Sequence, residues 1–191
     1  MDTSNKNKKR IKFSFTLDIM KIKDVVTFKL EKFTDQRGSF LKIFSKDFLL
    51  KNFGFDFKVE EFFYSISREK VIRGMHFQKK PYEQAKIIYV SKGSITDVLL
   101  DLRKDSETYL NYESIKLNSE TDMFLYIPRG IAHGFLTNEE NSIVNYLVDN
   151  VYFNKNEDGI LWNSFGYNWN INNPIISDRD SSFQTLDEYL K

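Results

Sequence analysis

Two histidines, His76 and His133, are the chain's whole supply of imidazole, and the chain contains no cysteine. Imidazole has a pKa close to neutral pH, so it serves well as a general base or as a metal ligand. The lack of cysteine excludes a disulfide framework, a thiolate nucleophile and a zinc-thiolate site. Chemistry that needs imidazole therefore has to be sought around these two positions.

The first histidine lies in a cationic motif, Arg73-Gly74-Met75-His76-Phe77-Gln78, which Gln84-Ala85-Lys86 follows. A guanidinium, an imidazole and an ammonium within one expected hairpin region would suit an anionic ligand. Strict alternation along a strand would place Arg73 and His76 on opposite faces, so a shared site requires a bulge or bend at Gly74. On composition alone, solvated surface charges and a buried, hydrogen-bonded histidine are the simpler interpretation.

The second histidine follows a turn motif, Pro128-Arg129-Gly130-Ile131-Ala132-His133. This P-x-G-x-x-H pattern resembles the second signature of the cupin jelly rolls. In metal-binding cupins the first signature supplies H-x-H and a glutamate, whereas this chain has His76-Phe77-Gln78. Zinc and iron sites usually take three or four nitrogen, sulfur or carboxylate ligands. Because His76, His133 and Glu83 make a poor set, we expect a site without a metal.

The elements that must position these motifs are short segments rich in β-branched and aromatic residues. The chain has 191 residues, of which 41% are hydrophobic and 16% aromatic, and this suits one domain with a sizeable core. Short polar segments separate the apolar runs, which predicts an antiparallel barrel or a double-sheet jelly roll. Residues 91–94 are expected to form a hairpin turn. The expected strands cover residues 25–33, 57–67, 85–103, 112–117, 123–128 and 142–152.

Helix is expected to be the minority element. The first candidate runs from Ser45, a possible N-cap, to Phe53, with Gly54 beyond its end. The second runs over residues 182–190, where apolar residues recur at helical spacing. Residues 20–191 are predicted to form a single domain. Residues 1–19 are open to three interpretations: a flexible tail, an added strand or an upstream start-site artefact.

Charge and hydropathy limit the class of partner. The formal net charge is +1, which argues against a general nucleic-acid binder and leaves room for a groove that binds one diphosphate. The longest apolar runs, such as residues 87–90 and 98–100, are far shorter than the roughly 20 residues that span a bilayer. The N-terminus lacks the pattern of a secretory signal. We therefore expect a cytoplasmic protein with no nucleic-acid and no membrane partner.

A longer series of motifs extends from about residue 21 to residue 182. Its members are Asp35-Gln36-Arg37-Gly38, the motifs of His76 and Lys86, Gly93, Asp97-Val98, Asp101-Leu102-Arg103, Ser106, Ile127-Pro128, Gly130, Ala132-His133-Gly134-Phe135, Gly159-Ile160, Trp162-Asn163 and Ser177-Asp178-Arg179-Asp180. In order and approximate spacing, this series is similar to the dTDP-4-dehydrorhamnose 3,5-epimerase family. The resemblance implies a cupin-type antiparallel jelly-roll barrel with a few short peripheral helices.

The resemblance implies a cofactor-independent epimerase that acts on a nucleotide-linked 4-keto-6-deoxy sugar. The C4 ketone acidifies the hydrogens on C3 and C5, so the chemistry needs a base, a cation or donor at the ketone oxygen, and an acid across the ring. His76 falls at the base position and Asp180 at that of its carboxylate partner. Tyr146 matches the general acid, with Tyr152 as the alternative donor, and Lys86 falls near the ketone oxygen.

The resemblance also implies which residues bind the nucleotide diphosphate sugar. Arg37 and Arg73 fall where the family contacts the diphosphate, and guanidinium suits phosphate because it offers forked donors. For His133, a structural hydrogen-bonding role is about as well supported as a place in the pocket. The remaining expected substrate-binding residues are Glu61, Phe63, Gln78, His133, Tyr152 and Arg179.

The chain departs from the family at Glu61 and Phe63, where the family commonly has glutamine and asparagine. A carboxylate cannot donate as an amide does and repels a diphosphate, while a phenyl ring removes hydrogen bonds and adds bulk. These changes keep alternatives open. They are an epimerase of one centre or of another nucleotide such as GDP, a non-catalytic sugar-nucleotide-binding cupin, and a metal-dependent cupin using His76, His133 and Glu83. By analogy with the family, we expect a homodimer.

Overall fold

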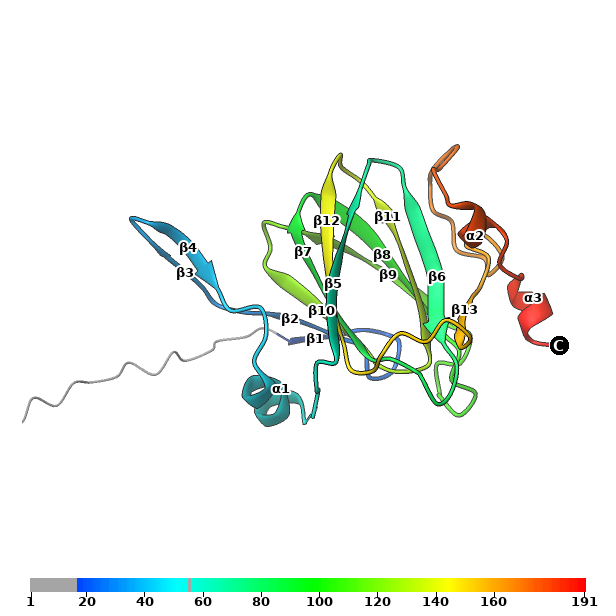
Figure 1. The fold of residues 1–191 in the computed structure, drawn as a ribbon, viewed down its shortest axis with the longest axis horizontal. Helices are drawn as coiled ribbons and strands as arrows, with labels where there is room; N and C mark the ends of the chain where they lie inside the picture. Colours follow the sequence, from blue (N-terminus) through cyan, green and yellow to red (C-terminus); the bar gives the residue numbers. More distant parts are fainter. Residues whose placement is uncertain (1–16, 55) are drawn as a thin grey trace, which may run out of the picture.

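A computed structural model describes residues 17–54 and 56–191, in which two antiparallel β-sheets face each other (Figure 1). One sheet has six strands in the order β1-β2-β10-β7-β12-β5, and the other has five in the order β13-β6-β11-β8-β9. This arrangement confirms the predicted all-β jelly-roll class. The strands are β1 (Leu17–Ile19), β2 (Val26–Lys29), β5 (Glu61–Ser67), β6 (Ile72–Gln78), β7 (Lys86–Lys92), β8 (Ser94–Asp101), β9 (Tyr112–Asn118), β10 (Met123–Ile127), β11 (Ile131–Thr137), β12 (Ser142–Val148) and β13 (Glu157–Gly159).

Apolar side chains from both sheets fill the space between them. Ile88 and Val90 of β7 are fully buried there together with Leu99 of β8 and Phe135 of β11. Burial of each such side chain contributes about 1.5–3 kcal/mol. Both outer faces are also partly covered, which explains the continuous apolar runs at residues 87–90 and 98–100: a strand buried on both faces does not alternate.

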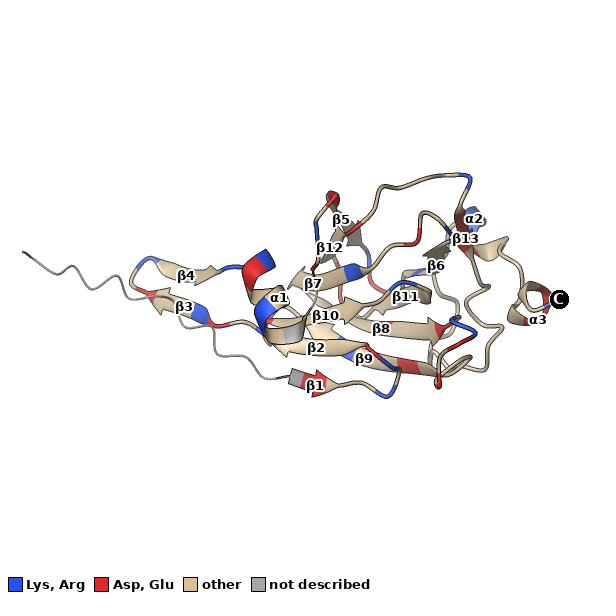
Figure 2. Ribbon diagram, turned by 90° about the horizontal axis from the view of Figure 1, so that it is seen from below, with Lys and Arg blue, Asp and Glu red and all other residues tan. Residues whose placement is uncertain are grey.

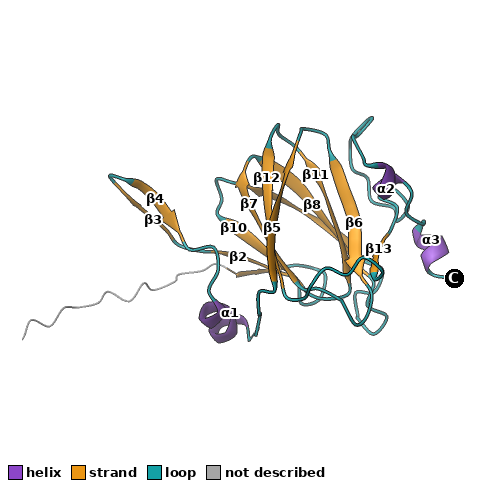
Figure 3. Ribbon diagram, viewed as in Figure 1, coloured by secondary structure: helices purple, strands orange, loops and turns teal. Residues whose placement is uncertain are grey.

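Different segments cover the two outer faces (Figure 3). Phe48 and Leu49 of helix α1 (Lys46–Phe53) pack on Phe124 of the six-stranded sheet. Ile160 and Trp169, from the chain beyond β13, pack on the five-stranded sheet. None of the described helices is both long enough and apolar enough to cross a membrane.

The first predicted helix is confirmed with its caps. The Ser45 side chain accepts a hydrogen bond from the backbone N–H of Phe48, and Gly54 ends the helix with a left-handed φ of 70°. The second prediction, a helix over residues 182–190, is confirmed only in part, because the helix in this range is the shorter α3 (Leu186–Tyr189). Another short helix, α2 (Asp178–Ser181), precedes it. Thr185 is extended and caps α3, so the chain between them cannot be helical.

The predicted hairpin at residues 91–94 is also wrong. β7 pairs with β10 and β12 in one sheet, whereas β8 pairs with β9 and β11 in the other. The turn therefore carries the chain from one sheet to the other, through Gly93 at φ 75°. Apolar runs of this kind fit a crossing between sheets as well as a hairpin. Likewise, His76 on β6 and Lys86 on β7 come from opposite sheets and not from one hairpin.

A two-stranded hairpin, β3 (Lys32–Asp35) and β4 (Gly38–Leu41), projects away from the sheets (Figure 1). Sequence reasoning expected residues 25–33 to be one strand, but the structure divides them between β2 and β3. Of the expected N-terminal extension, residues 1–16 lie outside the described residues, and Leu17–Ile19 form β1, which pairs with β2.

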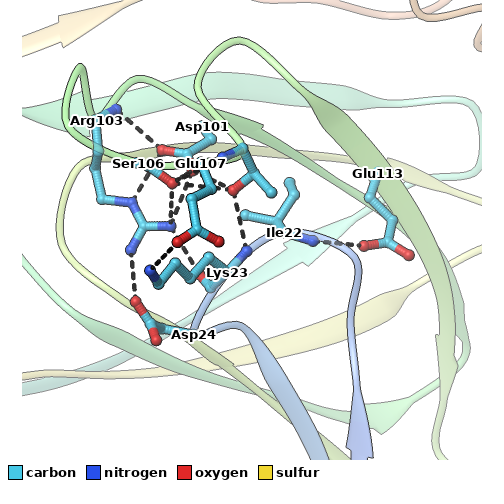
Figure 4. A network of polar contacts seen from close by, with 9 residues as sticks. Ile22, Lys23, Asp24, Asp101, Arg103, Ser106, Glu107 and Glu113 are labelled. Atoms are coloured by element: carbon cyan, nitrogen blue, oxygen red, sulfur yellow. Dashed lines mark hydrogen bonds and ion pairs between the residues drawn. The ribbon is translucent and has the colours of Figure 1, made fainter.

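The segment before β2 is held by a polar network around Arg103 (Figure 4). The guanidinium donates to the backbone carbonyl of Lys23 at 2.7 Å and to the Asp24 carboxylate at 3.1 Å. It is itself fixed by the buried carboxylate of Asp101 at 2.9 Å. Figure 2 shows acidic and basic residues interspersed along the chain, which agrees with the balanced charge of the sequence.

The bulge that a shared site requires is present at Gly74. His133 pairs with His76 and Phe135 pairs with Arg73, so β6 carries one more residue than β11 over this stretch. Gly74 has a φ of 122°, and a Cβ there would lie 2.8 Å from the carbonyl oxygen of His133. The extra residue turns Arg73 and His76 to the same cavity.

We expect Gly74→Ala to lower the free energy of unfolding by about 3 kcal/mol or more, because it combines a disfavoured φ with a clash against backbone. Gly54→Ala is the matched control: its φ is 70° but no atom lies within 4 Å of the added Cβ. The control should cost about 1 kcal/mol. Urea unfolding measures both values, and equal losses in the two variants would contradict the role given to the bulge.

Candidate active site

A cavity of about 380 Å³ opens between the two sheets. This volume lies in the range of about 300–1,000 Å³ that is usual for small-ligand sites. One wall comes from β6 and β11, and the facing wall comes from β5, β7 and β12. The cavity brings together ten of the predicted residues: Glu61, Phe63, Arg73, His76, Gln78, Lys86, His133, Tyr146, Tyr152 and Arg179.

Asp180 lies behind His76. Its Oδ1 is 2.9 Å from Nε2 of His76, and its Oδ2 accepts a hydrogen bond of 2.9 Å from the backbone N–H of Gly74. The Ser177 side chain accepts from the backbone N–H of Asp180 and so caps α2, which carries the carboxylate. Asp180 is only 3% exposed, so these partners rather than water satisfy its charge.

The surroundings of Asp180 and His76 determine which of the two side chains is charged at neutral pH. Burial raises the pKa of Asp180, but hydrogen bonds from His76 and Gly74 and the charge of Arg179 outweigh it and hold the pKa at about 2. Burial lowers the pKa of His76 below 6.5 in spite of the Asp180 carboxylate. At neutral pH the carboxylate is therefore ionised and the imidazole is neutral, the state that a general base requires.

Arg179 also contacts the histidine. Its Nη2 lies 2.9 Å from Nε2 of His76, and its Nε lies 3.2 Å from Oδ1 of Asp180. Its Nη1 donates to Glu157 at 2.8 Å. The ring of Phe183 supports both partners: it meets the His76 ring edge to face at 5.7 Å and lies 5.8 Å from the guanidinium carbon.

Tyr146 faces the cavity from β12, in the sheet opposite to His76. The Phe63 ring stacks on it with centroids 4.9 Å apart, and Ser65 lies within hydrogen-bond distance of its hydroxyl at 3.3 Å. Burial raises the pKa of Tyr146 above its usual value of 10.0. The phenol is therefore protonated at neutral pH and available as a donor.

Lys86 begins β7 and lines the same cavity. Burial lowers the pKa of its ammonium to about 8, while the charges of Asp97 and Glu157 oppose that shift. Lys86 thus keeps most of its charge at neutral pH. A cation in this position can stabilise negative charge that develops on a bound ligand.

His133 lines the cavity and is also hydrogen-bonded within the fold. Its position therefore fits both expected roles, a place in the pocket and a structural hydrogen bond. Its Nε2 is 2.9 Å from Oδ2 of Asp97, and both side chains are buried. Burial raises the pKa of Asp97, while the charge of His133 opposes that shift. Sequence reasoning matched Asp97 to the family but gave it no role. The signal that could have found it is a single carboxylate inside an apolar strand.

Gln78 and Glu61 hold the loop that carries Tyr152. The Gln78 amide donates to the carbonyls of Tyr82 and Val151 and accepts from the backbone N–H of Phe153 at 2.7 Å. Glu61 accepts from the backbone N–H of Tyr152 at 3.1 Å. The Tyr152 hydroxyl donates to Glu157 at 2.7 Å.

Two predicted residues do not line this cavity. One is Asp180, which lies behind His76 as expected of its partner. The other is Arg37, which lies at the end of the projecting β3–β4 hairpin and pairs with Asp35. Glu83, considered as a metal ligand, is not on the cavity wall either. Residues 17–54 and 56–191 contain no group of three or more His, Asp or Glu side chains that could hold a metal ion.

Known proteins are similar to this chain in sequence and in fold over most of its length. A sequence model of dTDP-4-dehydrorhamnose 3,5-epimerase matches residues 19–188. The dTDP-4-dehydrorhamnose 3,5-epimerase of Shigella flexneri is 34% identical over 165 residues, which cover 85% of this chain and 91% of that protein. The crystal structure of the Bacillus anthracis enzyme with TDP and PPi bound is 35% identical, with a TM-score of 0.86 over 91% of this chain and 100% of that one. The Sulfolobus tokodaii enzyme is 38% identical, with a TM-score of 0.84 over 91% and 96%.

We expect Asp180→Asn to destabilise the protein in a pH-dependent way. The pKa of Asp180 is lowered from 3.8 to about 2, so its ionised form stabilises the fold above the unfolded value, and this stabilisation is lost as the pH falls through about 2. By linkage the contribution at neutral pH is roughly 2–3 kcal/mol. Urea unfolding at several pH values should show a gap between wild type and variant that narrows toward low pH. A gap that is constant with pH would contradict the assignment.

Proposed function

This chain belongs to the dTDP-4-dehydrorhamnose 3,5-epimerase family, and we propose that it epimerises a nucleotide diphosphate-linked 4-keto-6-deoxy sugar at C3, C5 or both. The observation that carries the proposal is a neutral imidazole and a protonated phenol on facing walls of one cavity, with an ammonium beside them. These are the base, acid and cation that the reaction requires. The names of the relatives support dTDP as the nucleotide.

In the first step His76 removes a proton from the carbon next to the ketone. When Nε2–H donates to Asp180, the lone pair of the neutral ring lies on Nδ1, which is the nitrogen that accepts the proton. The electrons of the C–H bond form the C=C bond of an enolate, and negative charge moves to O4. The Asp180 carboxylate stabilises the imidazolium that results.

The second step returns a proton to the opposite face of the ring. Tyr146 supplies it from the other sheet, and the carbonyl at C4 forms again as the enolate collapses. Lys86 stabilises the charge on O4 while it exists. Exchange with water then removes the proton from His76 and restores the one on Tyr146, so no cofactor is consumed.

The diphosphate is expected to bind the arginines at the edge of the cavity. Arg73 is anchored through Nε to the Ser67 hydroxyl at 3.0 Å, lines the cavity and is exposed to solvent. Arg179 lines the same cavity and is half exposed. Forked guanidinium donors suit phosphate oxygens. Tyr152, on the loop held by Gln78 and Glu61, offers an exposed aromatic ring to the nucleotide.

Isotope exchange tests the activity directly. In deuterated water with dTDP-4-keto-6-deoxyglucose, wild type should place deuterium at C3, C5 or both, and His76→Asn should lower the exchange rate at least about 10²-fold, the usual contribution of a general base. Tyr146→Phe should exchange deuterium while forming little inverted product, because the proton returns from the His76 side. Tyr112→Phe, on β9 outside the cavity, is the matched control and should behave as wild type.

The position of the label shows which carbon exchanges its proton, and the configuration of the product tells one inverted centre from two. A panel with GDP-linked sugar tests the nucleotide. Calorimetry with dTDP measures binding separately from chemistry. Binding without exchange of any 4-keto-6-deoxy sugar nucleotide would overturn the proposal in favour of a non-catalytic sugar-nucleotide-binding cupin.

We further propose that the protein is a homodimer in which the β3–β4 hairpin packs on the second copy. Phe40 of the hairpin is 56% exposed, and Phe62, Tyr64 and Ile66 form an exposed apolar row on edge strand β5. Apolar rows of this kind commonly mark interfaces. A second copy would also give Arg37 a cavity to reach, since it does not line its own. The cytoplasmic location expected from the sequence also stays a prediction.

Mixing two inactive variants tests this arrangement. Arg37→Met retains His76, and His76→Asn retains Arg37, so a mixed dimer has one cavity with both groups if Arg37 acts on the partner. We expect each variant alone to be impaired, and each heterodimer in their refolded mixture to have up to about half of the activity of a wild-type dimer, because one of its two cavities holds both groups. Light scattering gives the oligomeric state. A monomer, or a mixture no more active than its components, would contradict the proposal.

A further inference from the structure

One nitrogen of His76 has two neighbours with opposite requirements. Nε2 lies 2.9 Å from Oδ1 of Asp180 and 2.9 Å from Nη2 of Arg179. An ionised carboxylate can only accept a hydrogen bond, and a guanidinium can only donate one. A ring nitrogen carries either a hydrogen or a lone pair in the ring plane. Nε2 can therefore bond only one of these neighbours at a time.

The partner of Nε2 decides whether the ring can act as a base toward the cavity. If Nε2–H donates to Asp180, the neutral ring keeps its lone pair on Nδ1. If Nε2 accepts from Arg179, the hydrogen lies on Nδ1 and the remaining lone pair is engaged. Only the first tautomer can take a proton at Nδ1, and the second is idle.

We propose that Arg179 is a positioning residue that switches His76 between these tautomers when a nucleotide diphosphate binds. In the empty site the guanidinium donates to Nε2 and holds the idle tautomer. The bound diphosphate draws the guanidinium away, and Nε2–H then donates to Asp180 and frees Nδ1. The inference rests on the proposed function, because it takes the diphosphate as the ligand of the same cavity.

The two neighbours differ in their freedom to move. Asp180 is 3% exposed, and its second oxygen is fixed by the backbone N–H of Gly74, so the carboxylate stays in place. The Arg179 side chain is 51% exposed and lines the cavity, so a ligand can reach it. The Asp180 carboxylate is thus the fixed neighbour of Nε2, and the Arg179 guanidinium is the displaceable one.

The contacts of Arg179 favour its displacement by phosphate. Besides His76, it binds Asp180 through a long contact of 3.2 Å and Glu157 at 2.8 Å, and the Glu157 carboxylate is shared with the Tyr152 hydroxyl. A neutral ring nitrogen is a weaker acceptor for guanidinium than a phosphate oxygen, which is charged and allows bidentate geometry. The Phe183 ring contacts both the guanidinium and the imidazole, so Arg179 can move along an apolar surface without breaking a further hydrogen bond.

The small number of histidines makes the switch directly measurable. Nitrogen NMR of the full chain labelled with ¹⁵N-histidine contains signals from His76 and His133 only, and His76→Asn assigns them. Without ligand, we expect the His76 Nε2 signal to be of the unprotonated type and Nδ1 to be of the protonated type. Saturation with dTDP should exchange the two types. His133, bonded to the buried Asp97, is the internal control and should not change.

A variant without the guanidinium should be locked in the active tautomer. Arg179→Met should give the dTDP-bound signal pattern before dTDP is added, and it should raise KM by about tenfold or more, with a smaller loss in kcat, since a charged contact to phosphate is lost. Arg129→Met is the matched control, because Arg129 binds Asp149 and lies outside the cavity. It should leave the His76 signals and the kinetics unchanged.

The results separate this inference from the proposed function. The switch would be overturned if His76 had the same tautomer with and without dTDP. It would also be overturned if ligand-free Arg179→Met showed the signal pattern of ligand-free wild type. Either result holds even if wild type exchanges deuterium into the sugar. A ligand-dependent change that Arg179→Met abolishes would support it. If that change occurs in a protein that exchanges no deuterium, the switch stands and the epimerase function falls.

Discussion

The buried carboxylate of Asp180 is the interaction on which the rest of the site depends. A charge that is removed from water must find hydrogen-bond donors within the protein, or the fold loses several kcal/mol. Asp180 finds them in the backbone N–H of Gly74 and the guanidinium of Arg179, and its Oδ1 also lies 2.9 Å from Nε2 of His76. These contacts tie the C-terminal segment to β6 and require that Gly74 expose its N–H at the bulge. The same bulge turns His76 and Arg73 toward one cavity.

The two-sheet architecture places the proposed base and the proposed acid on opposite walls of the cavity. His76 belongs to the five-stranded sheet, while Tyr146 and Lys86 belong to the six-stranded one. Each sheet is backed by further apolar packing, from α1 on one side and the segment after β13 on the other. Close packing on both faces of a sheet restricts its movement, which suits catalysis by placement and electrostatics.

The sequence was most informative where one residue type is scarce. Two histidines without cysteine directed attention to His76, and the motif order then predicted the fold class and ten of the cavity residues. The sequence did not reveal features that depend on which strands and side chains pair in the tertiary structure. An apolar run does not reveal that β7 and β8 enter different sheets, and Arg37 lies on a hairpin that no periodicity marks. Asp97 was matched to the family but received no role, because its role depends on His133, its hydrogen-bond partner in the tertiary structure.

The residues that depart from the family have clear uses in this cavity. Glu61 looked unfavourable beside a diphosphate, yet its carboxylate accepts the backbone N–H of Tyr152 and so fixes the loop. Phe63, which cannot replace an amide's hydrogen bonds, stacks on Tyr146 and shields the phenol from water. Shielding keeps that phenol protonated. Both changes therefore lie on the wall that carries Tyr146, the proposed acid, and leave the His76 wall intact. In the proposed mechanism they bear on reprotonation, whereas proton removal depends on His76 and Asp180, which the chain retains.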